Sequence, residues 1–523
     1  MILFDELLDQ TGKYGAFQAL MFFISQITAL MGAGHLTAGF LMLGRYKPKY
    51  ACWTENGTEI LFNDTCQLIR TCDNYTADTP FYSMYQEWEI ACLPTYYWTT
   101  LTSIVPVCAA VGTVLAGHLG DHFGRKWVVY FGFFATIACH AGEVIAPNWK
   151  VYFALMLLGS LVAPLFYCPK FALIMETVSK KYRLLQTLSG QWSIMYMVAA
   201  CIAYLSGHWR YTLGITVVAT LPLLGLWLLI EESPRWLIQK KRYKKAAAAL
   251  NRIAWWNRKT ARFTSKDMEG VVLQAGASGD SNRKYTFFDL FATRLMTKYF
   301  LAQTLTGICI NLVGMVTMMN VQELYGNPFL NVASMGALRL WSPVLVLFLN
   351  YYSKAFGRRT LFLGSQSAML ICFLVVFGLQ WSGLWSSWHL LGSAAALLGF
   401  CINFGVVWIA YKQFSVELFP TVIRAIALSA FSLVSMIGTV IAPQLILLGH
   451  FWRPAPSAGT ALLSATSLLV GYFIYPETRG RSLPDTIEEM ETKFLRVATQ
   501  PAELLKLDHE DGQSEASDEK EDA

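Results

Sequence analysis

A few basic residues lie deep within long apolar stretches of this 523-residue chain. Lys170, Arg339 and Lys412 each interrupt such a stretch, whereas Glu143 and His35 lie nearer the outer ends of theirs. An ionisable side chain inside a membrane-spanning segment is costly, which makes it a candidate functional residue by default. Because the deep residues are all basic, they favour an anionic substrate. Two alternatives remain open: Lys412 could extend its ammonium to the inner surface, and Lys170 could pair with a helix end.

Aromatic side chains occur in several of the same stretches. Trp192 and Tyr196 share one stretch, and Phe404 and Trp408 share another. Aromatic rings can enclose flat, amphipathic solutes and can stabilise cations through their faces. We therefore include these four residues among the candidate substrate-binding residues. The alternative is that they serve only in packing, as most aromatic residues in membrane spans do.

The elements that position these residues must be membrane-spanning helices. The chain is 54% hydrophobic and 15% charged, with a mean hydropathy of +0.40, and soluble domains carry about 25% charged residues. Stretches 212–230, 301–319 and 425–447 contain no charged residue. A span needs about 20 apolar residues, and backbone groups in lipid must be satisfied internally, which requires a helix.

We predict an all-α membrane protein with twelve transmembrane helices in two six-helix, pseudo-symmetric bundles. The order of the spans is more secure than their ends, which can shift by about four residues. The predicted spans cover 16–38, 98–118, 127–146, 151–175, 187–206, 211–230, 299–319, 330–350, 361–380, 388–411, 425–447 and 456–475.

Lys and Arg residues in the loops predict the orientation of the spans. Basic residues follow the second, fourth, eighth and tenth spans, and the intervening loops are poorer in them. Cytoplasmic loops carry this excess of positive charge, so we expect both termini in the cytoplasm. The start, MILFDELLDQ, is acidic and lacks a basic region, so we expect no cleavable signal peptide. The net charge of +6 is attributed to topology and not to nucleic-acid binding.

The first long loop, at 44–97, has the features of an extracellular segment. It contains four cysteines, which suggest two disulfides with three possible pairings. It also contains three Asn-x-Ser/Thr sequons, which are glycosylation acceptors in exposed loops. The cysteines are Cys52, Cys66, Cys72 and Cys92, and the sequons begin at Asn56, Asn63 and Asn74.

Two further segments are expected on the cytoplasmic side. The central loop, 231–298, contains a basic stretch with helical spacing at 240–262. This stretch could lie against anionic lipid headgroups or act as a solvated helical linker between two bundles. The tail, within 491–523, is acidic and lacks aromatic residues after 507, which predicts disorder.

Three landmarks recur at nearly constant offsets. FGRK (123–126) and FGRR (356–359) place Gly124 and Gly357 233 residues apart. A Glu precedes an Arg by seven residues after the fourth span and again after the tenth, at an offset of 241. Glu232 and Glu477 are separated by 245 residues. Such offsets indicate two repeats of six spans, 1–230 and 299–490, as is common in secondary transporters.

Five motifs in order carry a resemblance to a known family. They are FDELLDQTGKYGAFQ (4–18), YQEWEIAC (85–92), GHLGDHFGRK (117–126), ELFPTVIR (417–424) and PETRGRSL (476–483). Over about 1–490 the chain resembles the major facilitator superfamily, and closely its organic cation/organic anion transporter (solute carrier 22-like) family. The resemblance implies a secondary transporter that works by alternating access.

The resemblance also implies a gate at the cytoplasmic mouth. In the family, these inner turns and Glu/Arg pairs hold the two halves together in the outward-open state. Asp121 could also cap a helix N-terminus, whereas Lys354, at the matching position, could not, which predicts a weaker second latch. The alternative is that these charges only set topology. The gating candidates are Asp121, Arg125, Lys126, Glu176, Arg183, Arg358, Glu417 and Arg424.

The residues that mark substrate charge in the family are both missing. Cation carriers have an Asp, and anion carriers tend to have an Arg, seven residues before a Pro in the eleventh span; that position is Met436, counted from Pro443. Anion carriers also have a Lys sixteen residues before the Glu of the ELFPT motif; that position is Cys401. The sign of the substrate therefore does not follow from the resemblance, although Lys170 or Arg339 could supply a positive charge from another position.

We therefore expect a plasma-membrane, multi-pass transporter of small organic ions, with organic anions favoured. Its expected partners are the substrate and membrane lipid, without nucleic acid, and we expect no cofactor and no metal ion. The alternative is a family member without transport that serves as a receptor or scaffold through its outer loop. No HExxH, GxSxG or Walker sequence is present, which disfavours an enzyme.

Overall fold

The computed structural model describes residues 2–43, 49–53, 59–60, 66, 75–78, 81–179, 182, 191–269, 271–272, 286–352, 357–478, 487 and 490. Within these residues, eleven helices are long and apolar enough to cross a membrane, and a twelfth, shorter apolar helix covers Trp192–Ser206. These twelve helices correspond in order to the twelve predicted spans.

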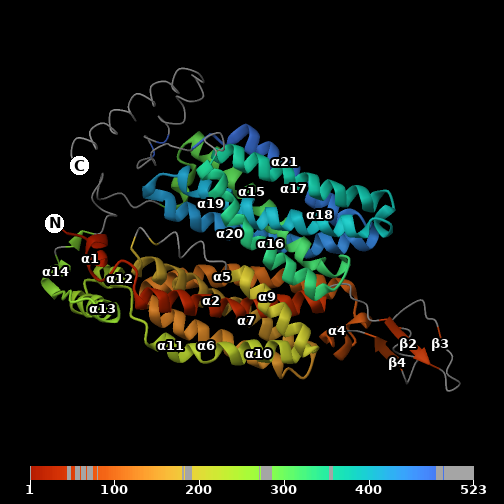
Figure 1. Ribbon diagram of the computed structural model, residues 1–523, viewed down its shortest axis with the longest axis horizontal. Helices are drawn as coiled ribbons and strands as arrows, with labels where there is room; N and C mark the ends of the chain where they lie inside the picture. Colours follow the sequence, from red (N-terminus) through yellow and green to blue (C-terminus); the bar gives the residue numbers. More distant parts are fainter. Residues whose placement is uncertain are drawn as a thin grey trace.

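The first half of the chain forms one group of helices, in the lower part of Figure 1. The predicted sixth span, 211–230, is two helices because Leu221 and Pro222 form a turn between them; Pro supplies no backbone N–H to continue an α-helix. The helices are α2 (Ala16–Leu43), α5 (Thr95–Phe123), α6 (Arg125–Val144), α7 (Trp149–Thr177), α9 (Gln191–Ser206), α10 (Trp209–Thr220) and α11 (Leu223–Leu228).

The second half forms the other group, in the upper part of Figure 1. Its tenth span is interrupted by a π-helical turn, η5 (Asn403–Val407), which joins α18 (His389–Ile402) to α19 (Trp408–Glu417). The other helices are α15 (Arg294–Met319), α16 (Pro328–Tyr352), α17 (Arg358–Trp381), α20 (Thr421–Phe451) and α21 (Ala455–Ile474).

Each group of helices has its own aromatic core. In the first, Phe133 stacks on Phe166 with ring centroids 4.5 Å apart, beside the fully buried Trp227. In the second, Phe414 stacks on Tyr475 at 4.7 Å. Because lipid is as apolar as these rings, close van der Waals packing, and not transfer out of water, is what holds the helices of each group together. Each group thus has a core of its own, and a further buried cluster, which includes Tyr196 and Val332, packs the two groups against each other.

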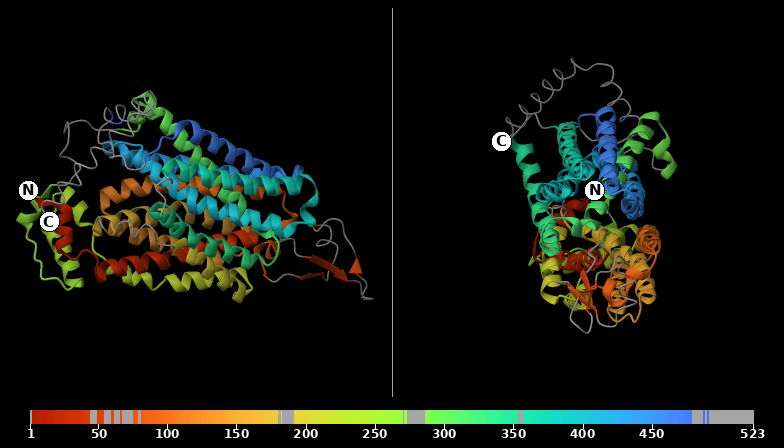
Figure 2. Two further views of the ribbon diagram at one scale, coloured as in Figure 1. Left: turned by 45° about the horizontal axis from the view of Figure 1, so that its top comes forward. Right: turned by 90° about the vertical axis from the view of Figure 1, so that its right-hand side faces the viewer.

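The central loop forms a small helical layer at one end of the molecule. It contains α12 (Pro234–Gln239), α13 (Tyr243–Trp256) and α14 (Ser265–Glu269), which lie with the N-terminal α1 (Phe4–Gln10) at the left of Figures 1 and 2. The apolar face of α13 includes Leu250 and packs against Phe4, Leu7 and Trp236. This face of the predicted helix therefore lies against protein. Strands β1 (Ile2–Leu3) and β5 (Val271–Val272) pair in parallel beside this layer.

The outer loop forms a small sheet at the opposite end, as the left view of Figure 2 shows. Strand β2 (Lys49–Trp53) pairs antiparallel with both β3 (Glu59–Ile60) and β4 (Tyr75–Asp78). A disulfide joins Cys66 to Cys92, which is one of the two expected. Cys72 and the three sequon residues, Asn56, Asn63 and Asn74, lie outside the described residues, as does the 491–523 tail.

The base of the outer loop is fixed by Glu87, at the end of α4 (Met84–Glu87). Its carboxylate accepts hydrogen bonds from Arg210 Nε at 3.0 and 3.1 Å and from Trp209 Nε1 at 2.7 Å. Burial opposes ionisation of Glu87, but these donors outweigh burial and lower its pKa below the usual value. Arg210 also donates to the carbonyls of Val144 and Ala146, so one side chain ties the loop to α10 and to the end of α6.

Candidate functional site

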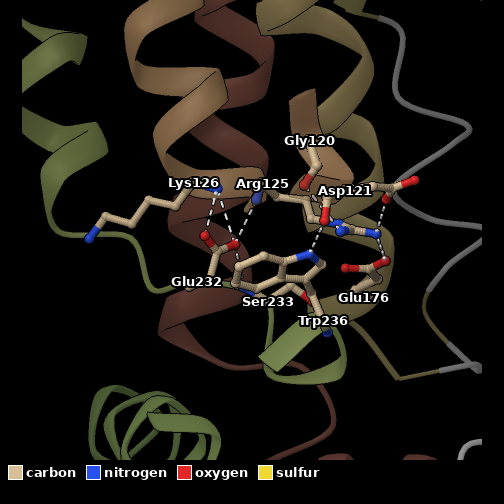
Figure 3. Close-up of polar contacts among 8 residues, drawn as sticks. All are labelled: Gly120, Asp121, Arg125, Lys126, Glu176, Glu232, Ser233 and Trp236. Atoms are coloured by element: carbon tan, nitrogen blue, oxygen red, sulfur yellow. Dashed lines mark hydrogen bonds and ion pairs between the residues drawn. The ribbon is translucent and has the colours of Figure 1, made fainter. Parts of the chain in front are cut away.

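The turn between α5 and α6 is organised around the guanidinium of Arg125 (Figure 3). One nitrogen, Nη2, lies 3.1 Å from Asp121 Oδ1 and 3.5 Å from Glu176 Oε1, and Nη1 donates to the carbonyl of Gly120 at 3.3 Å. Glu176 is largely buried, at the inner end of α7, whereas the Asp121 side chain is 76% exposed. The buried partner of Arg125 is therefore Glu176.

The N-terminus of α6 is capped by Glu232, and the expectation that Asp121 could cap a helix is wrong here. The Glu232 carboxylate accepts hydrogen bonds from the backbone N–H groups of Arg125 at 2.9 Å and Lys126 at 3.1 Å (Figure 3). A carboxylate at this position satisfies orphan donors and complements the helix dipole. Burial raises the pKa of Glu232, although its backbone donors oppose that shift. The main-chain carbonyl of Asp121 instead accepts a hydrogen bond from Trp236 Nε1 at 3.0 Å.

Gly124 is required for this arrangement. Its φ is +103°, and a Cβ atom there would lie 2.3 Å from Glu232 Oε2 and 3.1 Å from the Trp236 ring. Glycine adopts positive φ without the steric cost of a side chain. Gly124 of the FGRK motif thus allows the Glu232 carboxylate to reach the start of α6.

The second half repeats this geometry. Glu477 accepts from the backbone N–H groups of Arg358 at 2.7 Å and Arg359 at 3.1 Å, and Arg358 Nε lies 3.3 Å from Glu417 Oε1. A Cβ atom at Gly357 would lie 2.0 Å from Glu477. Glu477 therefore plays the part of Glu232, and Glu417 that of Glu176. The sequence predicted the recurrence but not the capping role of the two acids.

The other gating candidates are placed as follows. Lys126 directs its ammonium to the carbonyl of Leu228 at 3.1 Å, and Arg424 donates from Nε to the carbonyl of Phe419 at 3.1 Å. Arg183 and Lys354 lie outside the described residues. The described ion pairs of both turns join residues of the same half, so these contacts hold each half together at its inner end.

Lys170 is buried in the first half, and no carboxylate of the described residues pairs with it. Its ammonium lies 3.1 Å from Thr28 Oγ1, 4.6 Å from the centre of the Phe166 ring and 5.1 Å from that of Tyr167. None of the described ion pairs includes Lys170, Arg339 or Lys412. A buried charge without an opposite charge is costly, so Lys170 is a group whose charge a ligand could neutralise.

Arg339 lies where the two halves meet. Gly336, one helical turn before it in α16, packs so tightly on α9 that a Cβ atom would lie 2.4 Å from the carbonyl of Ser193. Arg339 lies 5.4 Å from the centre of the Phe404 ring and is close enough to Tyr196 and Cys401 to interact with both electrostatically. Cys401 Sγ also lies 2.9 Å from the carbonyl of Leu338. One basic side chain thus contacts surfaces from both halves.

Aromatic rings connect these basic residues. The rings of Trp192 and Tyr196 are 6.0 Å apart, and those of Phe404 and Trp408 are 6.2 Å apart. Gly32, in α2, faces both the Tyr167 hydroxyl and Trp192. The ammonium of Lys412 lies 4.9 Å from the centre of the Trp408 ring.

The substrate-binding candidates are therefore mostly brought together, with one exception. Ring contacts join Lys170 to Tyr167, Arg339 to Phe404, and Phe404 through Trp408 to Lys412. Tyr196 is close enough to both Tyr167 and Arg339 to interact with them electrostatically. Met436, half-buried on α20, takes part in none of the contacts described for these residues. Tyr167 was not predicted, although its position three residues before Lys170 places both on one helix face.

Apart from the surroundings of Arg339, the side-chain contacts described here between the halves are found toward the end of the molecule that carries the outer loop. Gln444 Nε2, on α20, donates to Ser103 Oγ, on α5, at 3.2 Å. Phe329, near the start of α16 in the second half, packs against Phe81 and Tyr204 of the first half, with ring centroids 5.8 and 5.7 Å apart. At the other end, the described pairs of Arg125 and Arg358 lie within their own halves.

Comparison with known proteins places this geometry among transporters. The family model described as Sugar (and other) transporter matches residues 39–494. The organic cation transporter protein of Drosophila melanogaster is 26% identical over 553 aligned positions, covering 95% of this chain and 96% of that protein. The organic cation/carnitine transporter 2 of Rattus norvegicus is 26% identical, covering 80% of this chain and 73% of that protein.

Solved structures give the same fold. The inward-open xylose transporter of E. coli superposes with a TM-score of 0.61 at 15% identity, covering 90% of this chain and 99% of that chain. A D-xylose–proton symporter structure gives 0.59 at 14% identity, covering 89% and 100%. The predicted major facilitator fold is confirmed, as is the resemblance to the organic cation/organic anion transporter family.

Proposed function

Because the chain belongs to the Sugar (and other) transporter family, we propose that it is a secondary transporter that moves small organic ions by alternating access. Relatives named as organic cation and organic cation/carnitine transporters support organic ions as the substrate class. Transport, and not a receptor role, is the function that these relatives favour. We place the chain in the plasma membrane with both termini in the cytoplasm, and its exposed apolar helix faces against lipid.

We further propose that the preferred substrates carry an anionic group such as a carboxylate. The observation that carries this proposal is the position of Arg339 beside Cys401. Cys401 is where the family resemblance leads us to expect a Lys in anion carriers. Arg339 supplies a positive charge to that region from α16 in place of α18.

The surroundings of Lys170 support the same preference. It is buried against a hydroxyl and two rings, and an anionic substrate would supply the missing opposite charge. A guanidinium can also bind a carboxylate through two parallel hydrogen bonds. The rings of Trp192 and Tyr196 would then hold the rest of the solute, including a positively charged group if the substrate is a zwitterion.

The inner turns suggest how the cycle is gated. We propose that the described conformation faces inward, because the contacts between the halves in the described part of the chain lie around Arg339 and near the outer loop, whereas the ion pairs of the inner turns stay within each half. In the outward-facing state, Arg125 and Arg358 would exchange part of their contacts within each half for contacts across the mouth. Asp121, which is largely exposed here, is free in space to take part in that exchange.

Uptake into proteoliposomes tests the proposal. Purified protein would be assayed against a panel of organic anions, cations and zwitterions of similar size. We expect saturable uptake, with anions and zwitterions preferred, and a loss of at least tenfold for these solutes in Arg339→Gln. Arg252→Gln is the matched control because Arg252 is 55% exposed and pairs with Glu231 far from the site.

The possible failures have different meanings. No saturable uptake of any class would contradict transport itself and restore the receptor alternative. Saturable uptake of cations alone, unchanged in Arg339→Gln and in Lys170→Gln, would leave transport intact and contradict the proposed preference for anionic groups.

A further inference from the structure

Two helices of the first half bring together three side chains that carry metal-ligating atoms. His140 and Glu143 lie three residues apart near the end of α6, and therefore on one helix face, and His35 faces them from α2. Their ligand atoms all lie within 4.8 Å of one another, and the two imidazole centroids are 4.6 Å apart. The sequence showed Glu143 and His35 as separate ionisable residues and gave no sign that His140 would join them.

The three side chains converge on one carboxylate oxygen. Glu143 Oε2 lies 3.0 Å from His140 Nδ1 and 3.2 Å from His35 Nδ1. In a tetrahedral zinc site, metal–ligand distances of about 2.0–2.2 Å place neighbouring ligand atoms roughly 3.3–3.5 Å apart. These two separations are about 0.3 and 0.1 Å below that range, and the ligand atoms of the two imidazoles lie within 4.8 Å of each other, so small side-chain rotations would admit an ion between the three groups.

Among the described residues, the two imidazoles are the groups that can bring positive charge to Glu143, and no Lys or Arg pairs with it. Its side chain is completely buried, and Oε1 has no hydrogen-bond partner among the described residues. That oxygen faces α7, 3.6 Å from the position a Cβ atom would occupy on Gly159. The other titratable side chains that interact with Glu143, Cys139 and Tyr152, carry no positive charge. Burial of a carboxylate is costly unless it is paired or coordinates a metal.

We propose that His35, His140 and Glu143 bind one divalent transition-metal ion of the zinc class. Two imidazoles and a carboxylate are ligands that zinc accepts, with the fourth position left to water. The side chains of His35 and His140 are 19% and 10% exposed, which leaves an approach for a hydrated ion. The bound metal ties α2 to α6 near the outer end of the first half, where it stabilises that half as a unit.

The metal ion alone is the probe in the test. Full-length protein in detergent would be stripped with a chelator and titrated with Zn²⁺, measuring bound zinc by elemental analysis and the melting temperature in parallel. We expect one equivalent of zinc and a rise in melting temperature. In Co²⁺-loaded protein we expect the intense visible absorption of a tetrahedral site.

Variants separate this cluster from surface histidines. His140→Ala and Glu143→Gln should each weaken zinc binding at least tenfold and abolish the thermal shift, whereas His118→Ala, a change at an exposed residue of α5, should leave both intact. If wild-type protein binds no zinc, or if zinc binding is equal in wild type, His140→Ala and Glu143→Gln, the proposal is overturned. Because wild-type stoichiometry is decisive, the test does not depend on the folding of any variant or on transport.

Discussion

Arg358 Nε lies 3.3 Å from Glu417 Oε1 in the second half, and Arg125 Nη2 lies 3.5 Å from Glu176 Oε1 in the first. Arg125 and Arg358 are the first residues of α6 and α17, and each follows a glycine. Glu176 and Glu417 lie at the C-terminal ends of α7 and α19. A second carboxylate accepts a hydrogen bond from the first backbone N–H of the same helix: Glu232 at α6 and Glu477 at α17. The two inner ends are thus built to the same plan from residues about 240 positions apart.

The coupling between Arg125 and Glu176 should be measurable. Both side chains are mostly buried, so a double-mutant cycle of Arg125→Gln and Glu176→Gln should give a coupling energy of about 1–2 kcal/mol in the free energy of unfolding. The pair Arg252–Glu231, in which the Arg252 side chain is 55% exposed, should give about 0.5 kcal/mol or less. Equal coupling energies in the two cycles would show that the inner pair contributes no more than a surface ion pair.

Gly124 should be far less tolerant than a helical glycine nearby. Gly124→Ala forces a Cβ atom toward Glu232 at positive φ, so we expect a loss of at least about 2 kcal/mol of stability. Gly117→Ala, in α5 with open space around the new methyl group, should stabilise by up to about 1 kcal/mol. Thermal melting of both variants checks this, and a stable Gly124→Ala protein would contradict the role assigned to the turn.

Asp121 should matter for transport more than for stability. Its side chain is 76% exposed and pairs with Arg125 one turn away, a contact worth about 0.5 kcal/mol or less. We therefore expect Asp121→Asn to melt within a degree or two of wild type while its uptake falls severalfold. Lys354→Asp should impair uptake less at equal surface expression. Equal uptake by the two variants would refute this difference between the halves.

Glu87 should make the outer loop sensitive to acid. Because its folded-state pKa lies below the usual value of 4.5, its contribution to stability is complete above that value and is lost as pH falls through the lower folded-state pKa. Glu87→Gln should therefore lower the melting temperature at pH 7, and the difference from wild type should shrink below about pH 4.5. Glu89→Gln, at an exposed neighbour, is the control. A difference that does not change with pH would rule out the ionised carboxylate as its source.

Much of the fold follows from local properties of the chain. Apolar runs determine the spans because lipid excludes unsatisfied backbone, and the FGRK and FGRR motifs are short enough to be recognised directly. The break at Leu221–Pro222 illustrates a limit: the proline was visible, but the surrounding run was apolar enough to be read as one continuous helix.

The site was less accessible from the sequence, because it depends on contacts between distant helices. Arg339 could be identified as a deep cation, but its position beside Cys401 arises from the packing of α16 on α18. The same is true of His140, which becomes a neighbour of His35 only through the packing of the first half. Met436 is a candidate only through its distance along the chain from Pro443, and a distance along one helix does not specify what the residue faces.

The π-helical turn at Asn403–Val407 has a consequence for how this span can vary. Each residue advances an α-helix by about 100°, and a π-helical turn holds an extra residue. A π-helical turn absorbs that extra residue without turning the helix beyond it, so loss of one residue at 403–407 would restore a continuous α-helix and leave Lys412 and Trp408 facing their present neighbours. A deletion within the regular helix α18 would instead turn the rest of the span by about 100°, so the π-helical turn is the one place in this span where the chain length can change by one residue while the lower part keeps its orientation.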